Sequence, residues 1–277
     1  MALLALAHDL AADMIEVATV DHGLRPEAGE ECALVERVCQ ERKIPCRILT
    51  VTVEEGNVQA RARAARYAAL GEWAVQRELA AVATAHHADD QAETLLMRLN
   101  RGSGLAGLAG IRPSTRIDGC PVPVIRPLLG FRKLELRQIV ERLDMPFVED
   151  PSNRNEDYDR VRIRKALAGA DWIDPLALSR SAAHLEEAER ALQTIAVQLW
   201  EAKAEVEGDR VLVPITDLLD TDARLIARAI AVFGRKVSHG EIMGFLKAGE
   251  RRANIAGVLI DRQSEVWVCT PEPQRRN

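Results

Sequence analysis

The stretch from Thr84 to Gly110 sets a dense polar cluster between an apolar segment and an amphipathic one, and it constrains the fold most strongly. The apolar run Leu79–Ala83 predicts a short buried strand. The polar residues that follow include two histidines, two aspartates, a glutamine and a glutamate. The next segment predicts a helix with an apolar stripe at Ala92, Leu95, Leu96 and Leu99. Open α/β sheets bind ligands at the carboxyl ends of their strands, so this order predicts an α/β ligand site. Gly102 and Gly104 are expected to end the helix in a left-handed cap.

Strand and helix patterns alternate along the first half of the chain. Strands are expected at 15–20, 46–53 and 79–83, and helices at 26–42, 57–79 and after residue 87. Pro26 stands near the start of the first of these helices, which is a favoured place for proline. Repeated strand–helix units predict an α/β fold with a doubly wound parallel sheet.

The second half of the chain has a different character. Asp118-Gly119 predicts a hairpin turn, 132–143 a helix, and 150–153 a turn. A long charged helix is expected at 176–205, followed by short helices and two strands, at 255–260 and 265–268. We therefore expect one domain at 1–174 and a smaller, mostly helical domain at 175–277.

The composition limits the class of protein. Of the 277 residues, 47% are hydrophobic and 29% charged, as in ordinary globular chains, and 4% aromatic content argues against a stacking platform for single-stranded nucleic acid. The net charge of −5 means that a polyanionic partner must meet a local basic patch. Five scattered cysteines without a Cys-x-x-Cys pair favour a reducing cytoplasm, and no apolar run predicts a membrane span.

The clustered polar residues each allow two interpretations. Asp90 with Glu93 resembles a helix-capping box, but Asp89 and Asp90 at a sheet edge also suit Mg²⁺ when phosphates supply the other ligands. His86 and His87 could take part in chemistry or satisfy a loop carbonyl. The glycines from 102 to 110 could cradle a phosphate, although they follow a helix instead of preceding one. The arginines at 160, 162 and 164 could be a solvated face.

Five motifs, in order, carry a resemblance to a known family. They are Val20-Asp-His-Gly-Leu-Arg-Pro-Glu-Ala28, Ala60-Arg-Ala-Arg-Ala-Ala-Arg-Tyr-x-x-Leu70, the His86–Gly110 block, Arg126-Pro-Leu-Leu129 and Asp150-Pro-Ser-Asn-x6-Arg-x-Arg-Ile-Arg164. Over about residues 1 to 170 the chain resembles the bacterial tRNA(Ile)-lysidine synthetases, of the N-type ATP pyrophosphatase (PP-loop) superfamily. The resemblance weakens in the C-terminal region, which in that family contacts tRNA.

The resemblance implies a ligase that modifies tRNA. ATP would adenylate the carbonyl oxygen at ring position two of the wobble cytidine in the isoleucine tRNA with a CAU anticodon. The amine of free L-lysine would then displace AMP to give lysidine. ATP and Mg²⁺ are the implied cofactors. A cytoplasmic location is implied, no membrane is involved, and the oligomeric state stays open, with a homodimer among the alternatives.

The resemblance also implies roles for individual residues. Asp90, Asp89, Arg66 and His86 would be catalytic, with Asp90 the metal-facing acid. Val20, Asp21, His22 and Arg61 would bind the nucleotide. The residues that would meet tRNA are Arg98, Arg101, Arg126, Arg160, Arg162 and Arg164.

One departure from the family pattern concerns the phosphate-binding loop. The Ser-Gly-Gly-x-Asp-Ser loop of the superfamily does not occur in this sequence. In the family that loop directly precedes an apolar helix start similar to 1–7. We expect Met1 to be an internal methionine, with the loop and the first, central strand of the sheet encoded upstream. Two alternatives remain: a degenerate, non-catalytic tRNA-binding remnant, and another PP-loop tRNA-modifying enzyme such as a thiolase.

Overall fold

The computed structural model describes residues 1–23, 27–52, 58–148 and 159–272, which form two compact units. The first unit comprises Met1–Ser103 and Gly107–His184, and the second comprises Gly104–Ala106 and Leu185–Asn277. The expected domain boundary near 174 coincides with the start of helix α8 (Pro175–Lys203), whereas the two units divide further along that helix.

A parallel pair of strands forms one part of the first unit. Strand β1 (Val17–Asp21) pairs in parallel with β2 (Cys46–Thr50), and Val17 lies opposite Cys46. Helix α2 (Glu27–Glu41) packs against both strands, and α1 (Ala2–Ala11), followed by the short 3₁₀ helix η1 (Ala12–Met14), packs against α6 (Lys133–Arg142). Their shared core contains Leu4, Val38, Cys39, Ile44, Val140 and Met145.

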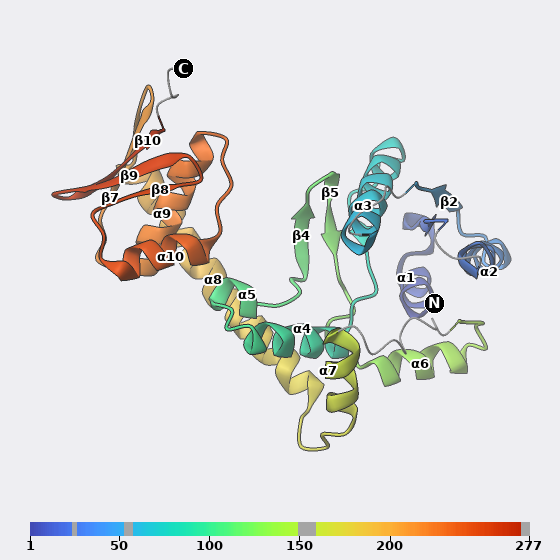
Figure 1. Cartoon of the computed structure of the whole chain (residues 1–277). Helices are drawn as coiled ribbons and strands as arrows, with labels where there is room; N and C mark the ends of the chain where they lie inside the picture. The colour runs from blue at the N-terminus through green and yellow to red at the C-terminus, as the bar shows by residue number, and fades with distance from the viewer. Residues whose placement is uncertain (24–26, 53–57, 149–158, 273–277) are drawn as a thin grey trace. The chain divides into compact units, whose positions relative to one another are not determined.

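A second group of strands leads into the polar cluster. Strand β3 (Val82–Ala83) pairs in parallel with β5 (Cys120–Ile125), and β4 (Ser114–Ile117) pairs with β5 in antiparallel direction. The predicted hairpin turn is confirmed, with Gly119 at φ +81°. Helix α3 (Val58–Gln76) lies between this hairpin and the β1–β2 pair (Figure 1). Its contact with β5 is tight, since a Cβ on Gly71 would lie 2.7 Å from the Cα of Cys120.

The predicted α/β alternation and parallel pairing are confirmed. Within the described residues the strands of the first unit form two separate sheets, β1–β2 and β3–β5–β4. No described strand lies between β1 and β3 to join them. Helix α4 (Ala88–Asn100) follows β3. Gly102 has the expected left-handed conformation, at φ +65°, whereas Gly104 does not. The short α5 (Leu105–Leu108) follows, and α7 (Asp159–Ala168) packs along α4. The predicted turn at 150–153 and the position of Pro26 lie outside the described residues.

The second unit combines helices with an antiparallel sheet. Its strands are ordered β6 (Glu205–Glu207), β7 (Arg210–Pro214), β10 (Val266–Pro271), β9 (Val258–Gln263) and β8 (Arg252–Ile255). Helices α9 (Leu219–Val232) and α10 (His239–Ala248) share its core (Figure 1). Only two of the five strands, β9 and β10, were predicted. β6 and β8 have only three and four residues, and the alternating buried residues Val211 and Val213 of β7 were missed. None of the described helices is long and apolar enough to cross a membrane.

Candidate functional site

The polar cluster begins where β3 ends and α4 starts. His87 is the N-cap of α4: its Nδ1 accepts from the backbone N–H of Asp90 at 3.3 Å, and Asp90 Oδ2 accepts from the N–H of His87 at 3.1 Å. The capping box predicted between Asp90 and Glu93 is therefore wrong. The helix starts at Ala88, so Asp90 takes the third helical position and its reciprocal partner is His87.

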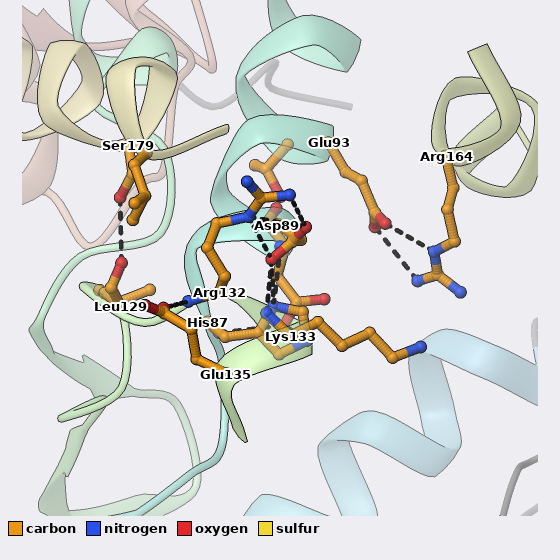
Figure 2. A network of polar contacts seen from close by, with 12 residues as sticks. His87, Asp89, Glu93, Leu129, Arg132, Lys133, Glu135, Arg164 and Ser179 are labelled. Carbon is orange, nitrogen blue, oxygen red and sulfur yellow. Dashed lines mark hydrogen bonds and ion pairs between the residues drawn. The ribbon is translucent and has the colours of Figure 1, made fainter. Parts of the chain in front are cut away.

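The acids of α4 pair with arginines of α7. Asp90 Oδ1 lies 2.7 Å from Nη2 of Arg160. Glu93 Oε2 lies 2.6 Å from Nε of Arg160, and Glu93 Oε1 lies 2.6 Å from Nε of Arg164. Figure 2 shows the fork between Glu93 and Arg164. Only 2% of Glu93 is exposed. Two arginines that were expected to meet tRNA thus neutralise carboxylates within the same unit, which buried acids require.

Asp89 connects α4 to the start of α6. Its carboxylate accepts from Lys133 N at 2.7 Å and from the Arg132 guanidinium at 3.2–3.3 Å (Figure 2). Burial alone would raise the pKa of Asp89, but the Lys133 N–H and the Arg132 guanidinium outweigh it and hold the pKa below its usual value. Asp89 therefore remains an anion that fixes two helices to each other.

His86 lies half-buried in a ring of charged groups. Its Nδ1 is 3.0 Å from Thr84 Oγ1. The pKa of His86 is lowered to about 4. Burial is the largest cause, Asp90 opposes it, and the cations of Arg126, Arg63 and Arg160 reinforce it. The imidazole is therefore neutral near pH 7. These groups come from α3, α4, α7 and the residue directly after β5, near the carboxyl end of β3.

Arg126 is the buried member of this ring. Its side chain donates to the carbonyl of Arg112 at 2.7 Å, and its Nε has no hydrogen-bond partner among the described residues. A buried donor without a partner costs about 1–3 kcal/mol, so this atom is a place where a polar ligand atom would be favourable.

The end of β1 carries the residues expected to bind the nucleotide. Val20 and Asp21 close the strand, and Asp21 Oδ1 accepts from the N–H of Gly23 at 2.9 Å. The Nδ1 of His22 is buried without a partner in the described part of the chain. Burial lowers the pKa of His22, the nearby Arg66 lowers it further, and Asp21 opposes them. Arg66 is thus within electrostatic range of the β1 end.

Helix α3 supplies cations toward both strand ends. Arg66 acts on His22 at the end of β1, and Arg63 acts on His86 at the end of β3. Arg63 also stacks on the ring of Tyr67 at 4.9 Å. The exposed Arg61 lies on the same helix, and it has a partner of its own in the structure. Two positive groups one turn apart suit an anionic ligand.

Arg98 holds the glycine-rich loop after α4. Its guanidinium donates to the carbonyls of Gly107 and Gly110, the latter at 3.3 Å. Gln91 fixes the end of the loop by accepting from Ile111 N at 2.6 Å and donating to Ile111 O at 3.0 Å. Arg98 therefore serves the loop's conformation here by binding two of its glycine carbonyls.

The remaining predicted arginines lie at the opposite end of α4. Arg101, just past the helix, and Arg162 of α7 are exposed, and both line a hollow of about 310 Å³. Arg101 and Arg162 each also have a partner in the structure, so a place at the hollow does not leave either of them unpaired.

The acids do not form a metal site by themselves. No group of three His, Cys, Asp or Glu side chains within the described ranges could hold a metal ion. Both oxygens of Asp90 already have partners, one in the capping box and one at Arg160. A resident magnesium cage does not fit this arrangement.

Three residues of the cluster were not predicted as site residues: Glu93, Arg63 and Arg132. Glu93 stands three positions after Asp90, so helical spacing could have placed both on one face. Arg63 belongs to the motif that runs from Ala60 to Leu70, but nothing in the sequence distinguishes it as a site residue from Arg61 and Arg66. The pairing of Arg132 with Asp89 spans 43 residues and has no local pattern.

Comparisons with known proteins agree with this geometry. Residues 1–170 match the PP-loop domain family. The chain is 42% identical to the tRNA(Ile)-lysidine synthase of Novosphingobium aromaticivorans, over 100% of this chain and 87% of that protein. It is 38% identical to the tRNA(Ile)-lysidine synthase of Zymomonas mobilis, over 95% of this chain and 82% of that protein. The U34-tRNA thiolase NcsA from Methanococcus maripaludis, solved with its [4Fe-4S] cluster, has a similar fold, with a TM-score of 0.55 at 16% identity over 67% of this chain and 66% of that chain.

Proposed function

This chain belongs to the tRNA(Ile)-lysidine synthase family of PP-loop proteins, and from that premise we propose that it joins free L-lysine to the wobble cytidine of an isoleucine tRNA with a CAU anticodon. ATP binding and tRNA modification follow from the family. What we propose beyond this is lysine as the amine, an adenylated cytidine as the intermediate, the isoleucine tRNA as the substrate, and the cytoplasm as the location.

The proposed reaction has two balanced steps. The O2 atom of cytidine attacks the α-phosphorus of ATP, and the bond to diphosphate breaks. The lysine amine then attacks ring carbon two, the carbon–oxygen bond to AMP breaks, and the amine loses one proton. The first step needs O2 held in line with the leaving diphosphate and the phosphate charge balanced, and the second needs the amine held above the plane of the ring at carbon two.

The ring of groups around His86 carries this proposal. Arg63 and Arg66 of α3 act on the ends of β3 and β1, where they can balance ATP phosphates. The orphaned Nε of Arg126 and Nδ1 of His22 can contact polar atoms of a bound substrate. His86, being neutral, can donate or accept one hydrogen bond without adding charge.

The carboxylates take different roles in the proposal. Asp90, at the first turn of α4 and electrostatically coupled to His86, is the nucleotide-facing carboxylate, which Arg160 and the N–H of His87 hold in place. Asp89 is a positioning residue, because its carboxylate is committed to Arg132 and Lys133. Magnesium would accompany ATP with phosphate ligands. The residues present do not hold it alone, so no step is assigned to it.

A thiolase is the second candidate, and the cysteines disfavour it. The sulfur chemistry of such enzymes requires thiolates or a cluster-binding set. Burial, with a smaller contribution from the neighbouring Cys46, raises the pKa of Cys39 to about 12, so this thiol stays protonated. No set of three potential ligands occurs among the residues that the structure describes.

Lysine incorporation is the direct test. The full-length protein that contains these residues is incubated with ATP, radiolabelled lysine and an isoleucine tRNA transcript with a CAU anticodon. We expect lysine in the tRNA and one AMP released per lysine. A transcript with adenosine at the wobble position, which has no carbonyl at ring position two, is the control and should stay unlabelled. Binding of tRNA without incorporation would support the non-catalytic remnant, and incorporation of sulfur from a labelled donor would support the thiolase.

A further inference from the structure

The segment from Gly110 to Pro113, which leads into β4, is fixed by side chains from two other parts of the first unit (Figure 1). Gln91 of α4 holds both backbone polar groups of Ile111, at 2.6 and 3.0 Å. The side chain of Arg126, directly after β5, donates to the carbonyl of Arg112 at 2.7 Å. The exposed Arg112 side chain therefore extends from a backbone that is held in one position.

Arg98 of α4 brings a second guanidinium to the same segment. Its Nη1 donates to the carbonyls of Gly107 and Gly110, the latter at 3.3 Å. Because both contacts use Nη1, the N–H groups on Nε and Nη2 are not taken up by these carbonyls, and a guanidinium binds phosphate through such groups. Gly110 and Arg112 are two residues apart, so their Cα atoms are separated by at most about 7 Å. One small anion can therefore contact both Arg98 and Arg112.

The surroundings of Arg98 disfavour its positive charge. The pKa of Arg98 is lowered, mainly by burial and also by the cation of Arg112. A lowered pKa means that the net effect of all the groups around this guanidinium opposes the charged form. An anion between the two guanidinium groups would turn their repulsion into two attractions. Phosphate suits this position, since it accepts several N–H donors at once.

Arg126 adds a third, buried cation beside this segment. It is only 6% exposed, and its Nε has no hydrogen-bond partner among the residues described. Its guanidinium contacts the carbonyl of Arg112, and its charge also acts on His86 in the polar cluster. Three arginines therefore make a local positive point on a chain whose net charge is −5, and a polyanion binds such a chain at local points of this kind.

The position along α4 indicates which part of a substrate would reach this point. Asp90 and Arg98 are eight residues apart on one helix, which is a rise of about 12 Å. In the proposed function the reacting groups lie beside Asp90 and His86, so a phosphate at Arg98 belongs to a neighbouring part of the substrate. An RNA strand carries a phosphate on each side of its reacting nucleotide, whereas the phosphates of ATP lie on one side only. The distance therefore favours the RNA backbone.

We infer that Arg98 and Arg112 together bind one phosphate group of a substrate, while Arg126 fixes the backbone that carries Arg112. This inference rests on the proposed function, since it takes tRNA and ATP as the two sources of phosphate. Arg112 thereby gains a role as a substrate-binding residue, and Arg98 combines such a role with its contacts to the loop carbonyls.

Two binding measurements test the inference and separate the sources of phosphate. The affinity of the full-length protein for the isoleucine tRNA transcript is measured between about 50 and 200 mM KCl, and its affinity for ATP is measured without tRNA. The variants are Arg112→Ala, Arg98→Lys and the two combined. Lysine keeps the positive charge but lacks the planar fork that can hold carbonyls and a phosphate at the same time. Arg47→Ala, which removes an exposed arginine of β2, is the matched control.

The expected result is the loss of one phosphate contact to tRNA. Arg112→Ala should weaken tRNA binding about 10-fold at the lowest salt and reduce the slope of log affinity against log salt by about 0.7–0.9. The combined variant should lose little more than Arg112→Ala, because both arginines act on the same phosphate. Arg47→Ala should match the wild type, and so should the ATP affinity of every variant. The urea midpoint of Arg112→Ala should equal that of the wild type, since this side chain is exposed.

Other outcomes decide against all or part of the inference. Salt slopes and ATP affinities equal to those of Arg47→Ala, with lysine incorporation by the wild type intact, would reject the phosphate site and leave the proposed function standing. Fully additive losses in the combined variant would reject a phosphate shared by the two arginines. Loss of ATP affinity with normal tRNA binding would retain the phosphate site and assign it to ATP. A wild-type protein that neither binds the tRNA nor incorporates lysine would reject the proposed function, and the ATP measurement would still decide the phosphate site.

Discussion

Glu93 of α4 and Arg164 of α7 form a two-point ion pair, with Nε to Oε1 at 2.6 Å and Nη2 to Oε2 at 3.2 Å. The same carboxylate also accepts from Arg160, which reaches on to Asp90. A nearly buried acid shared between two arginines keeps α7 against α4 and holds Asp90 in a fixed position at the edge of the site.

Replacing Glu93 with glutamine should loosen α7. The neutral amide cannot balance the charges of the two guanidinium groups. Removing one partner of a buried ion pair is costly because it leaves the other charge uncompensated. The Arg160 and Arg164 side chains are 41% and 32% exposed, so water screens part of the loss, and we expect a decrease of about 2 kcal/mol in the free energy of unfolding. Urea unfolding and faster hydrogen exchange of α7 amides are the measurements.

The control for Glu93→Gln is Glu141→Gln on α6. Its pair with Arg137 is about half exposed, at 50% and 49%, so its loss should cost under about 0.5 kcal/mol. Equal effects of the two substitutions would show that the buried network does not stabilise the α4–α7 contact.

Asp90→Asn tests whether this acid does more than cap α4. The asparagine oxygen can still accept from the N–H of His87, but the ion pair with the partly exposed Arg160 is lost, so the free energy of unfolding should fall by about 1–2 kcal/mol. Lysine incorporation should nevertheless be lost, because the charge that faces His86 is gone. The control is Asp144→Asn, at an exposed position with φ +48° that asparagine tolerates. Activity retained in Asp90→Asn would reduce this residue to a cap.

The alternating elements of the first unit could be predicted because their patterns are local. The strand expected at 46–53 is β2, Cys46–Thr50, and the helix expected at 132–143 is α6, Lys133–Arg142. Gly102 and Gly119 adopt the left-handed conformations that their turns require. Each of these depends on a few neighbouring residues, which the sequence displays directly.

The partners of the charged residues could not be predicted in the same way. Arg160 and Glu93 are 67 residues apart, and Arg132 and Asp89 are 43 apart, so no spacing rule connects them. Arg98 resembles Arg101 in sequence, yet one binds loop carbonyls and the other lines a hollow. Even the capping box was assigned to the wrong pair, since it depended on whether the helix begins at 88 or later.

The low pKa of His86 predicts a pH dependence of stability. In the folded chain His86 is neutral down to about pH 4, whereas in the unfolded chain it takes up a proton near pH 6.5. Between these values the unfolded state binds more protons, so the free energy of unfolding falls as the pH is lowered through this window. His86→Asn keeps a hydrogen-bonding group but cannot titrate. From pH 7 to 4.5 the wild type should lose on the order of 2 kcal/mol more than the variant.

Urea unfolding at pH 7, 5.5 and 4.5 measures this difference. Asp89 does not interfere, because its lowered pKa places the loss of its contribution at still lower pH. Parallel pH profiles for the wild type and His86→Asn would mean that the histidine is solvated and not held neutral.

Gly110→Ala should disrupt the end of the glycine-rich loop. Gly110 has φ +67°, which costs an alanine about 1 kcal/mol or more, and an added Cβ would lie 2.4 Å from Oε1 of Gln91. Gln91 is buried and holds both backbone groups of Ile111, so it cannot move away without breaking those bonds. We expect a loss of about 3 kcal/mol in the free energy of unfolding, from strain and the lost hydrogen bonds together.

Gly104→Ala is the matched control for this loop. An added Cβ at Gly104 has no atom within 4 Å, and the residue is not in the left-handed region, so its free energy of unfolding should change by less than about 0.5 kcal/mol. Because Arg98 also donates to Gly110 O, the Gly110 variant should release that guanidinium as well. Amide hydrogens at the C-terminal end of α4 should then exchange faster in the Gly110 variant. If the Gly110 variant is as stable as the Gly104 variant, Gln91 does not hold the loop.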